Sequence, residues 1–422
     1  MSEIDDYTNN EDVLESVSEY KKDLDIKYRK NSSTISEFLG DASPVVETIK
    51  LHSFYSDFLA WGVSRVIESS EFKVNAILGT QDEPVFSSVQ TDYDKQESCL
   101  TEGIRLVERN GIRMAITLDG RGNIQIAVKA ENQEKAKSLL LDINAYMDEH
   151  NIYKGKRLKL NGEISFLDVK QRDWESVILD ASTKESVRLN TVGFLNNVDK
   201  IEELGIPPKR GIILAGDPGT GKTIICKAIM AEAENITCIT TEAYGQYSGP
   251  YISGLYYLAQ DLSPSLVFLE DIDFIGQERE DFYFGNPPLL TLLAEMDGIT
   301  EKKAIVTVAT SNFFEKLDKA LSERPSRFDC VYRINRPDKG QRAELINNIS
   351  NKIPCSEDVK KHIVNSTDGF TPAQVQEVLH SMAISHVTRA KGTIQFNTND
   401  VDLAIAQINY KRNDAMGFNR TS

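Results

Sequence analysis

One stretch of the sequence has the residue types and the spacing that bind the phosphates of a nucleotide. Residues 216–223 fit the pattern G-x-x-x-x-G-K-[ST] at every fixed position. Such a loop directs backbone N–H groups toward one point, where the positive end of a helix dipole adds to them. Lys222 would reach the outer phosphates, and the Thr223 hydroxyl would help to hold Mg²⁺. The residues that we expect to bind the nucleotide are Gly216, Asp217, Pro218, Gly219, Thr220, Gly221, Lys222 and Thr223.

A run of carboxylates follows a second apolar segment, residues 265–269. Hydrolysis of a nucleotide needs one carboxylate near the metal and its water shell, and one group that orients or deprotonates the attacking water. By position, Glu270 would serve the metal through water, and Asp271 would serve the attacking water. Asp273 is a second candidate for the water if the strand continues through it.

Three further polar residues could act on the same phosphates. The amide of Asn312 follows a third apolar segment and can hydrogen-bond both the attacking water and the terminal phosphate, although an asparagine there is more often a turn residue. Arg324 and Arg327 lie close together and have two interpretations. They form surface ion pairs, or they reach a neighbouring subunit's nucleotide, where one arginine can raise the rate about 10³–10⁵-fold.

The elements that must position these side chains are short apolar strands alternating with helices between residues 174 and 337. This alternation is typical of a parallel sheet with crossover helices, and the carboxyl ends of its strands meet at one edge. We therefore predict an α/β fold, a P-loop NTPase parallel sheet with a C-terminal helical lid, preceded by a small α+β domain. The expected strands are 211–215, 236–240, 266–270, 304–309 and 329–334, and the expected helix after the loop is 223–234.

The chain divides into five predicted parts. They are an acidic, disordered tail (1–43), an α+β recognition or adaptor domain (44–165), the nucleotide-binding α/β domain (166–337), a helical lid subdomain (338–410) and a tail (411–422). Within 44–165 we expect helices among residues 45–67, a strand at 72–78, a hairpin with arms 112–118 and 124–128, and a helix at 136–147. The basic residues among 154–159 fit a solvated linker better than a phosphate site, and a short strand-like piece spans 393–397.

Composition excludes several classes of function. A net charge of −16 argues against binding duplex nucleic acid, although a local basic channel stays open. The five cysteines are scattered without C-x-x-C spacing, as in a reducing compartment, and no H-E-x-x-H zinc protease motif occurs. No apolar run approaches membrane-spanning length, and the N-terminus is acidic rather than signal-like. We expect a cytoplasmic protein without a membrane anchor.

Taken together, the motifs resemble those of the AAA+ ATPases, in particular the AAA subgroup of FtsH, valosin-containing protein and the Bcs-type ATPases. The resemblance covers residues 174–407 and leaves out the first 165. Besides the loop, the segments that carry it are 205–211 (GIPPKRG), 269–273 (LEDID), 295–298 (EMDG), 309–312 (ATSN), 324–329 (RPSRFD) and 369–373 (GFTPA).

The resemblance implies an ATP- and Mg²⁺-dependent ATPase that assembles as a homo-hexamer with nucleotide between its subunits. Asn312 would match the sensor-1 residue, and Arg324 and Arg327 would match the paired arginine fingers. Tyr244 lies where the family carries a pore-loop aromatic residue that grips polypeptide. The following Gly245-Gln246 departs from that pattern, so an ordinary loop tyrosine is the alternative.

A second departure concerns the carboxylates. Most AAA members read Asp-Glu where this chain reads Glu270-Asp271, whereas the Bcs group resembles this chain. Each side chain differs by one methylene from the usual one, so its contacts must shift by more than about an ångström or act through water. We therefore expect hydrolysis that is slow.

The leading hypothesis is a chaperone-like ATPase that remodels, unfolds or disassembles a protein partner chosen by the 44–165 domain. The alternative is a nucleotide-gated scaffold or regulatory assembly protein with slow ATPase activity and no threading. A DNA-linked machine is disfavoured by the net charge.

Overall fold

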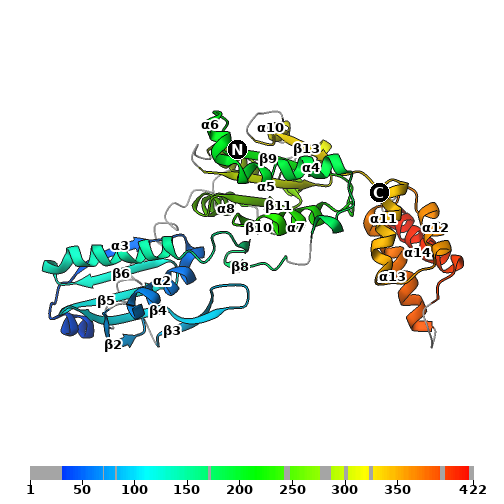
Figure 1. Cartoon of the computed structure of the whole chain (residues 1–422). Helices are drawn as coiled ribbons and strands as arrows, with labels where there is room; N and C mark the ends of the chain where they lie inside the picture. The colour runs from blue at the N-terminus through cyan, green and yellow to red at the C-terminus, as the bar shows by residue number, and fades with distance from the viewer. Residues whose placement is uncertain are drawn as a thin grey trace, which may run out of the picture. The chain divides into compact units, whose positions relative to one another are not determined.

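The computed structural model describes residues 31–69, 71–80, 83–169, 173–241, 248–275, 287–298, 303–322, 327–389 and 395–417. The chain divides into two compact units (Figure 1). Unit 1 comprises Met1–Ile152 and Gly162–Phe166, and unit 2 comprises Tyr153–Asn161 and Leu167–Ser422. None of the described helices combines the length and the apolarity needed to cross a lipid bilayer.

Unit 1 is built on a six-stranded antiparallel sheet. Its order is β1-β6-β5-β4-β2, and β3 also pairs with β4. Helix α2 contacts β4, and helix α3 contacts β1 and β6. The bounds are β1 Val45–Lys50, α2 Ser56–Ser69, β2 Lys73–Leu78, β3 Val85–Gln90, β4 Gln96–Arg109, β5 Ile112–Asp119, β6 Asn123–Val128 and α3 Gln133–Glu149.

The predicted hairpin is the pair β5–β6, with Leu118 opposite Ile124. The Asp119 carboxylate accepts hydrogen bonds from the backbone N–H groups of Arg121 at 2.8 Å and Asn123 at 3.1 Å. An aspartate that bonds its own following backbone in this way stabilises a turn. The hairpin is confirmed by this pair, the strand predicted at 72–78 by β2, and the helix predicted at 136–147 by α3.

Two predictions in this unit are wrong. Residues 45–50 form strand β1 rather than part of a helix, because their side chains alternate between half-buried and exposed along β6. Residues 31–39, assigned to the acidic tail, form a helix whose Ile35 and Leu39 are buried against Ile104 and Leu106 of β4. Two apolar residues four positions apart lie on one helix face and suffice for this packing.

Unit 2 holds the strands β13-β9-β12-β11-β10-β7, in that order, of a seven-stranded sheet whose last strand, β8, lies in the residues assigned to unit 1. The pairs from β13 to β7 are parallel. All five strands predicted from buried apolar runs are present. The bounds are β7 Arg157–Leu160, β8 Ile164–Phe166, β9 Lys209–Ala215, β10 Thr237–Thr241, β11 Ser265–Leu269, β12 Ile305–Ser311 and β13 Cys330–Arg333.

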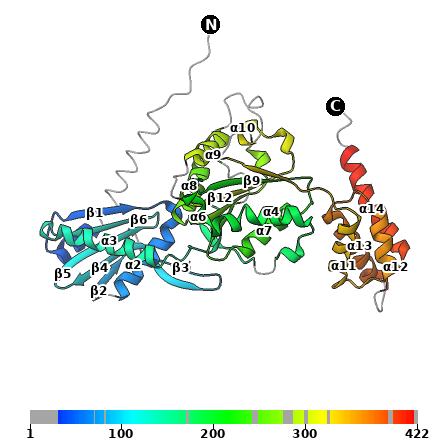
Figure 2. The same cartoon turned by 45° about the horizontal axis from the view of Figure 1, so that its top comes forward.

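Helices cover both faces of this sheet (Figure 2). On one face, Ile212, Phe268 and Val308 pack with side chains of α4, α5 and α7. On the other face, Tyr256 of α8 lies against Thr307, with their hydroxyl groups 3.0 Å apart. The helix bounds are α4 Ala181–Leu189, α5 Val192–Asn196, α6 Val198–Glu203, α7 Lys222–Glu232, α8 Gly249–Asp261, α9 Pro287–Gly298 and α10 Lys319–Ser322.

The basic stretch 154–159 is not a solvated linker. Strand β7 pairs with β10, and Arg157 donates hydrogen bonds to the carbonyl oxygens of Met230 at 2.9 Å and Ala233 at 2.8 Å. Its guanidinium satisfies backbone acceptors at the end of α7, which a helix leaves without partners of its own. Residues 153–161 therefore belong to unit 2, whereas we expected the boundary after residue 165.

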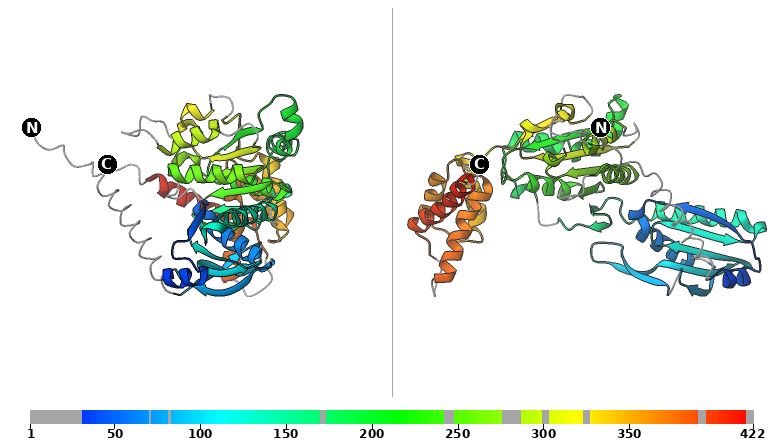
Figure 3. Two further views of the ribbon diagram at one scale, coloured as in Figure 1. Left: turned by 90° about the vertical axis from the view of Figure 1, so that its left-hand side faces the viewer. Right: turned by 180° about the vertical axis from the view of Figure 1, so that it is seen from behind.

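The C-terminal part of unit 2 is helical, as predicted, and its helices lie together (Figure 3, orange to red). Its own core includes Ile346, Ile363, Val375, Leu379 and Val401. Residues 395–397, the described part of the predicted strand-like piece, form no strand, and the last helix extends into the range predicted as a tail. The bounds are α11 Lys339–Ser350, α12 Glu357–Ser366, α13 Pro372–Arg389 and α14 Thr398–Gly417.

Candidate functional site

The loop between β9 and α7 has the backbone that its glycines predict. A Cβ atom on Gly216 would lie 2.3 Å from the carbonyl oxygen of Ile334, so only glycine fits there. Gly221, immediately before α7, has φ of 104°, which is open to glycine but costly for other residues. Glycine is therefore required at position 216 for a steric reason and at position 221 for a conformational reason.

Lys222 is the first residue of α7 and is buried. Its ammonium donates hydrogen bonds to the carbonyl oxygens of Gly216 at 2.7 Å and Asp217 at 3.1 Å, and to Oδ1 of Asn312 at 2.7 Å. Burial lowers the pKa of Lys222, while nearby carboxylates, Asp271 first, act in the opposite direction. A buried ammonium with oxygen partners at the mouth of this loop is suited to an anionic ligand.

Oxygen groups suited to Mg²⁺ lie beside the lysine. Strand β11 ends at Leu269, and Glu270 follows at the carboxyl edge of the sheet. The Thr223 hydroxyl donates to Oε2 of Glu270 at 3.4 Å. A hydroxyl and a carboxylate at this distance are the hard oxygen groups that Mg²⁺ prefers, directly or through its water shell. The residues present therefore fit the metal.

Asp271 and Asn312 are brought together, as expected of residues at neighbouring strand ends. The Asn312 side-chain N–H donates to Oδ1 of Asp271 at 2.8 Å, so Asn312 bridges Asp271 and Lys222. The backbone N–H of Asp271 donates to the Thr310 hydroxyl at 2.8 Å. Asp271 has φ of 51°, a left-handed conformation that is strained for a residue with a Cβ. The surrounding contacts hold its carboxylate in one place.

Asp273 is not a second candidate for the attacking water. The strand stops at Leu269, and Ile272–Phe274 form a 3-10 turn instead of continuing it. The buried Asp273 carboxylate accepts from the Ser311 hydroxyl at 2.7 Å and from the backbone N–H groups of Asn312 at 2.6 Å and Phe313 at 3.2 Å. It fixes the turn that carries Asn312.

Arg327 has partners within its own chain. Its guanidinium is only 5% exposed, bonds both carboxylate oxygens of Asp297 at 2.9 and 2.6 Å, and donates to the carbonyl oxygen of Ala320 at 2.7 Å. The bonds to Asp297 raise the pKa of Arg327. Arg327 therefore forms an ion pair, one of the two interpretations of this arginine, but its side chain is buried rather than at the surface. Arg324 and Tyr244 lie outside the described residues.

The loop also contacts the helical part of unit 2. Arg336 donates to Oδ2 of Asp217 at 2.8 Å and to the carbonyl oxygen of Gly369 at 2.7 Å. The backbone N–H of Ala373, at the start of α13, donates to the carbonyl oxygen of Gly219 at 3.2 Å. The nucleotide loop is thus bonded to the segment that resembles the family's lid motif.

Residues 218–223 of the loop, Asp271 and Asn312 line one cavity of about 410 Å³, a size suited to a small-molecule ligand. Another cavity, of about 480 Å³, has Asn312 in common with it and is lined by Gly216 and Asp217, but it lacks Lys222 and Thr223, so we assign the nucleotide to the first. Several lining residues were not anticipated, because only tertiary structure brings them to the loop. They are Ser176, Val177, Ile178, Thr310, Leu345, Pro372, Ala373 and Gln376.

Residues 212–336 match the family model described as "ATPase family associated with various cellular activities (AAA)". The proteasome-activating nucleotidase of Methanocaldococcus jannaschii is 27% identical over 62% of this chain and 66% of its own length. The nucleotidase of the same name from Saccharolobus solfataricus is 26% identical over 71% of this chain and 82% of its own length. The chloroplastic ATP-dependent zinc metalloprotease FTSH 7 of Arabidopsis thaliana is 34% identical over 54% of this chain, but over only 29% of its own length.

Proposed function

Because this chain carries an AAA domain, and is thereby an ATPase, we propose that it uses ATP hydrolysis to remodel, unfold or disassemble a protein partner as a hexameric ring. One observation carries the proposal: Lys222, Asn312 and Asp271 form a continuous hydrogen-bonded chain beside the Thr223–Glu270 pair. Lys222, Thr223, Asp271 and Asn312 line one cavity at the carboxyl edge of a parallel sheet, which supports the proposal.

In the proposed reaction each group has a separate task. Lys222 holds the outer phosphates, and Thr223 and Glu270 hold Mg²⁺, which neutralises phosphate charge when it is bound. Asp271 orients the attacking water and accepts its proton. Asn312 keeps Asp271 in place and bonds the terminal phosphate. The shorter reach of Asp271, compared with a glutamate, favours a slow rate.

The relatives support a protein as the substrate. Their names describe activation of the proteasome and ATP-dependent proteolysis, both of which act on polypeptides. Unit 1 has its own sheet and helices, and we assign to it the choice of partner.

The five cysteines are free, and we place the protein in the cytoplasm on that pattern.

For the ring, we propose that Arg324 reaches the nucleotide of the neighbouring subunit. Arg327, fixed by Asp297, would then hold the segment that carries Arg324. Arg324→Ala should abolish turnover while ATP binding and thermal stability stay near wild type. Arg327→Ala should also lower the free energy of unfolding by about 1–3 kcal/mol, because it removes the hydrogen bonds that the buried guanidinium makes to Asp297 and to the carbonyl oxygen of Ala320. Equal thermal stability of the two variants would reject this division of roles.

The experiment that tests the remodelling proposal uses the Asp271→Asn protein, which should bind ATP without hydrolysing it. We expect sedimentation in Mg-ATP to show a hexamer that retains a specific partner, and ADP to release that partner. A monomer at all concentrations of protein and nucleotide would contradict the ring. Tyr244→Ala then separates threading from a scaffold: partner remodelling lost with ATPase activity intact supports threading, and remodelling that is preserved contradicts it.

A further inference from the structure

One wall of the nucleotide cavity is the short segment 176–178, which follows Trp174. Residues 176–178 line the cavity together with Ile224 and Ile225 of α7. The loop and Lys222 occupy the polar part, so the apolar walls remain for the flat base of the nucleotide. The position of residues 176–178 therefore decides how much space the base has.

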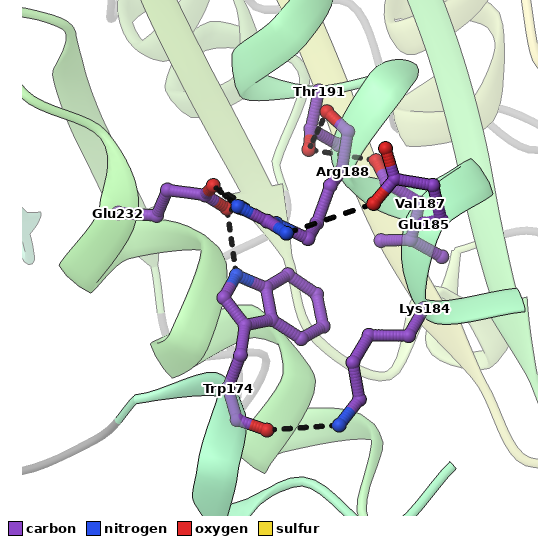
Figure 4. Close-up of polar contacts among 7 residues, drawn as sticks. All are labelled: Trp174, Lys184, Glu185, Val187, Arg188, Thr191 and Glu232. Carbon is purple, nitrogen blue, oxygen red and sulfur yellow. Dashed lines mark hydrogen bonds and ion pairs between the residues drawn. The ribbon is translucent and has the colours of Figure 1, made fainter. Parts of the chain in front are cut away.

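This wall is anchored two residues earlier, at Trp174 (Figure 4). The indole N–H of Trp174 donates to Oε2 of Glu232 at 2.6 Å. Both oxygens of the same carboxylate accept from Nε of Arg188, Oε1 at 2.9 Å and Oε2 at 3.1 Å, and Oε1 also accepts from Nη2 of Arg188. On the other side, the Lys184 ammonium donates to the carbonyl oxygen of Trp174 at 3.0 Å. Trp174 is thus held through both its side chain and its backbone.

The position of Glu232 is unfavourable for its own helix. It is the last residue of α7, where the negative end of the helix dipole repels a carboxylate. Its side chain is only 24% exposed, so water offsets this repulsion only in part. The bonds to Trp174 and Arg188 offset this repulsion, which indicates that the carboxylate is there for its tertiary contacts.

Helix α7 connects the phosphate loop to the residue that anchors Trp174. Lys222 begins it at the phosphate loop, and Glu232 ends it, about 15 Å away at the usual rise per residue. We propose that Glu232 is a positioning residue for the nucleotide base: through Trp174 it holds residues 176–178 at a fixed distance from the phosphate loop. The inference rests on the proposed nucleotide site and adds to it the residue that fixes the base end.

The test compares two ligands that share phosphates but differ in the base. Isothermal titration of the full chain measures the affinity for Mg-ATP and for inorganic tripolyphosphate with Mg²⁺. Glu232→Ala and Trp174→Phe should each weaken ATP binding about tenfold, the scale of a lost hydrogen bond to a charged group, and leave tripolyphosphate unchanged. The double variant should be no worse than either single one, since both remove the same bond.

Two conservative variants serve as controls. Glu232→Gln keeps an acceptor for the indole N–H and should recover most of the ATP affinity. Glu185→Gln removes a carboxylate that pairs with Arg188, at 3.6 Å, rather than with Trp174, and should bind ATP as wild type does. In steady-state turnover, Glu232→Ala should raise KM for ATP while kcat stays within about twofold, a separation that general misfolding does not produce.

The possible failures are distinguishable. Wild-type protein that binds neither ligand would overturn the nucleotide site itself, and this inference with it. If the wild type binds both ligands, two results would overturn only the role of Glu232. One is an ATP affinity that Glu232→Ala leaves unchanged, and the other is an equal loss of affinity for both ligands in that variant. If Glu232→Ala does not fold, Trp174→Phe decides, because it keeps an aromatic ring and removes the N–H donor.

Discussion

Three carboxylates follow β11 within four residues, and their surroundings give them different tasks. Glu270 lies beside the Thr223 hydroxyl, Asp271 beside the Asn312 amide, and Asp273 beneath the backbone of the turn after β12. The same functional group can therefore serve a metal, a water molecule or a turn, depending on the donors that surround it.

Amide variants should separate the last two tasks. Asp271→Asn removes the proton acceptor and should lower kcat about 10²–10⁴-fold with little change in ATP affinity. Asp273→Asn weakens three hydrogen bonds in a buried place and should lower the free energy of unfolding by about 1–3 kcal/mol. Chemical denaturation and single-turnover kinetics of both variants measure this; a stability loss in Asp271→Asn alone would contradict the assignment.

Most residues of the candidate site could be predicted because they lie at the ends of strands. A parallel sheet brings such ends to one edge, so the loop after β9, which leads to Lys222, and the residues Asp271 and Asn312 converge without any knowledge of packing. The prediction for Asp273 failed because it assumed a continuing strand, whereas the chain turns at the left-handed Asp271. The sequence carried no signal for that conformation, which glycine would have indicated.

At the scale of elements, the strands of unit 2 were predictable for a related reason. A strand buried on both faces is an uninterrupted apolar run, as in β11 and β12. Strand β1 was missed because its half-buried alternation precedes a helix with many apolar residues. The wall at 176–178 was missed because its place beside α7 depends on Trp174 and Glu232, which are 58 residues apart.

The core around α7 and β10 makes a prediction about cysteine chemistry. Burial raises the pKa of the Cys238 thiol to about 12 and raises that of Cys226 further. At pH 8 Cys238 is therefore almost entirely in the thiol form, whereas the thiolate is the reactive form. Iodoacetamide should therefore modify the half-buried Cys330 and Cys355 before Cys226 and Cys238 in the native protein.

The control for this labelling is the denatured chain, in which all five cysteines should react at similar rates. Mass spectrometry of tryptic peptides follows each site separately. Rapid modification of Cys226 or Cys238 in native protein would show that α7 or β10 opens readily, contrary to the packing described above.

At the scale of the whole molecule, each unit has its own core and only unit 2 contains the nucleotide site. A ligand stabilises what it binds, by about 2.7 kcal/mol at a concentration one hundred times its Kd. Mg-ATP should therefore slow hydrogen exchange in α7, β10 and β11 and leave β4, β5 and β6 of unit 1 unchanged. Equal protection of both units would indicate that they unfold as one body.

The central claim is that the loop at 216–223 binds ATP for hydrolysis, and steady-state phosphate release tests it most directly. Lys222→Ala removes the ammonium at the phosphates, whereas Lys227→Ala makes the same change of charge elsewhere on α7. With Mg²⁺ present, we predict turnover in the wild type and in Lys227→Ala, and at least an approximately 100-fold loss in Lys222→Ala. Turnover in Lys222→Ala equal to that of the wild type would contradict the account.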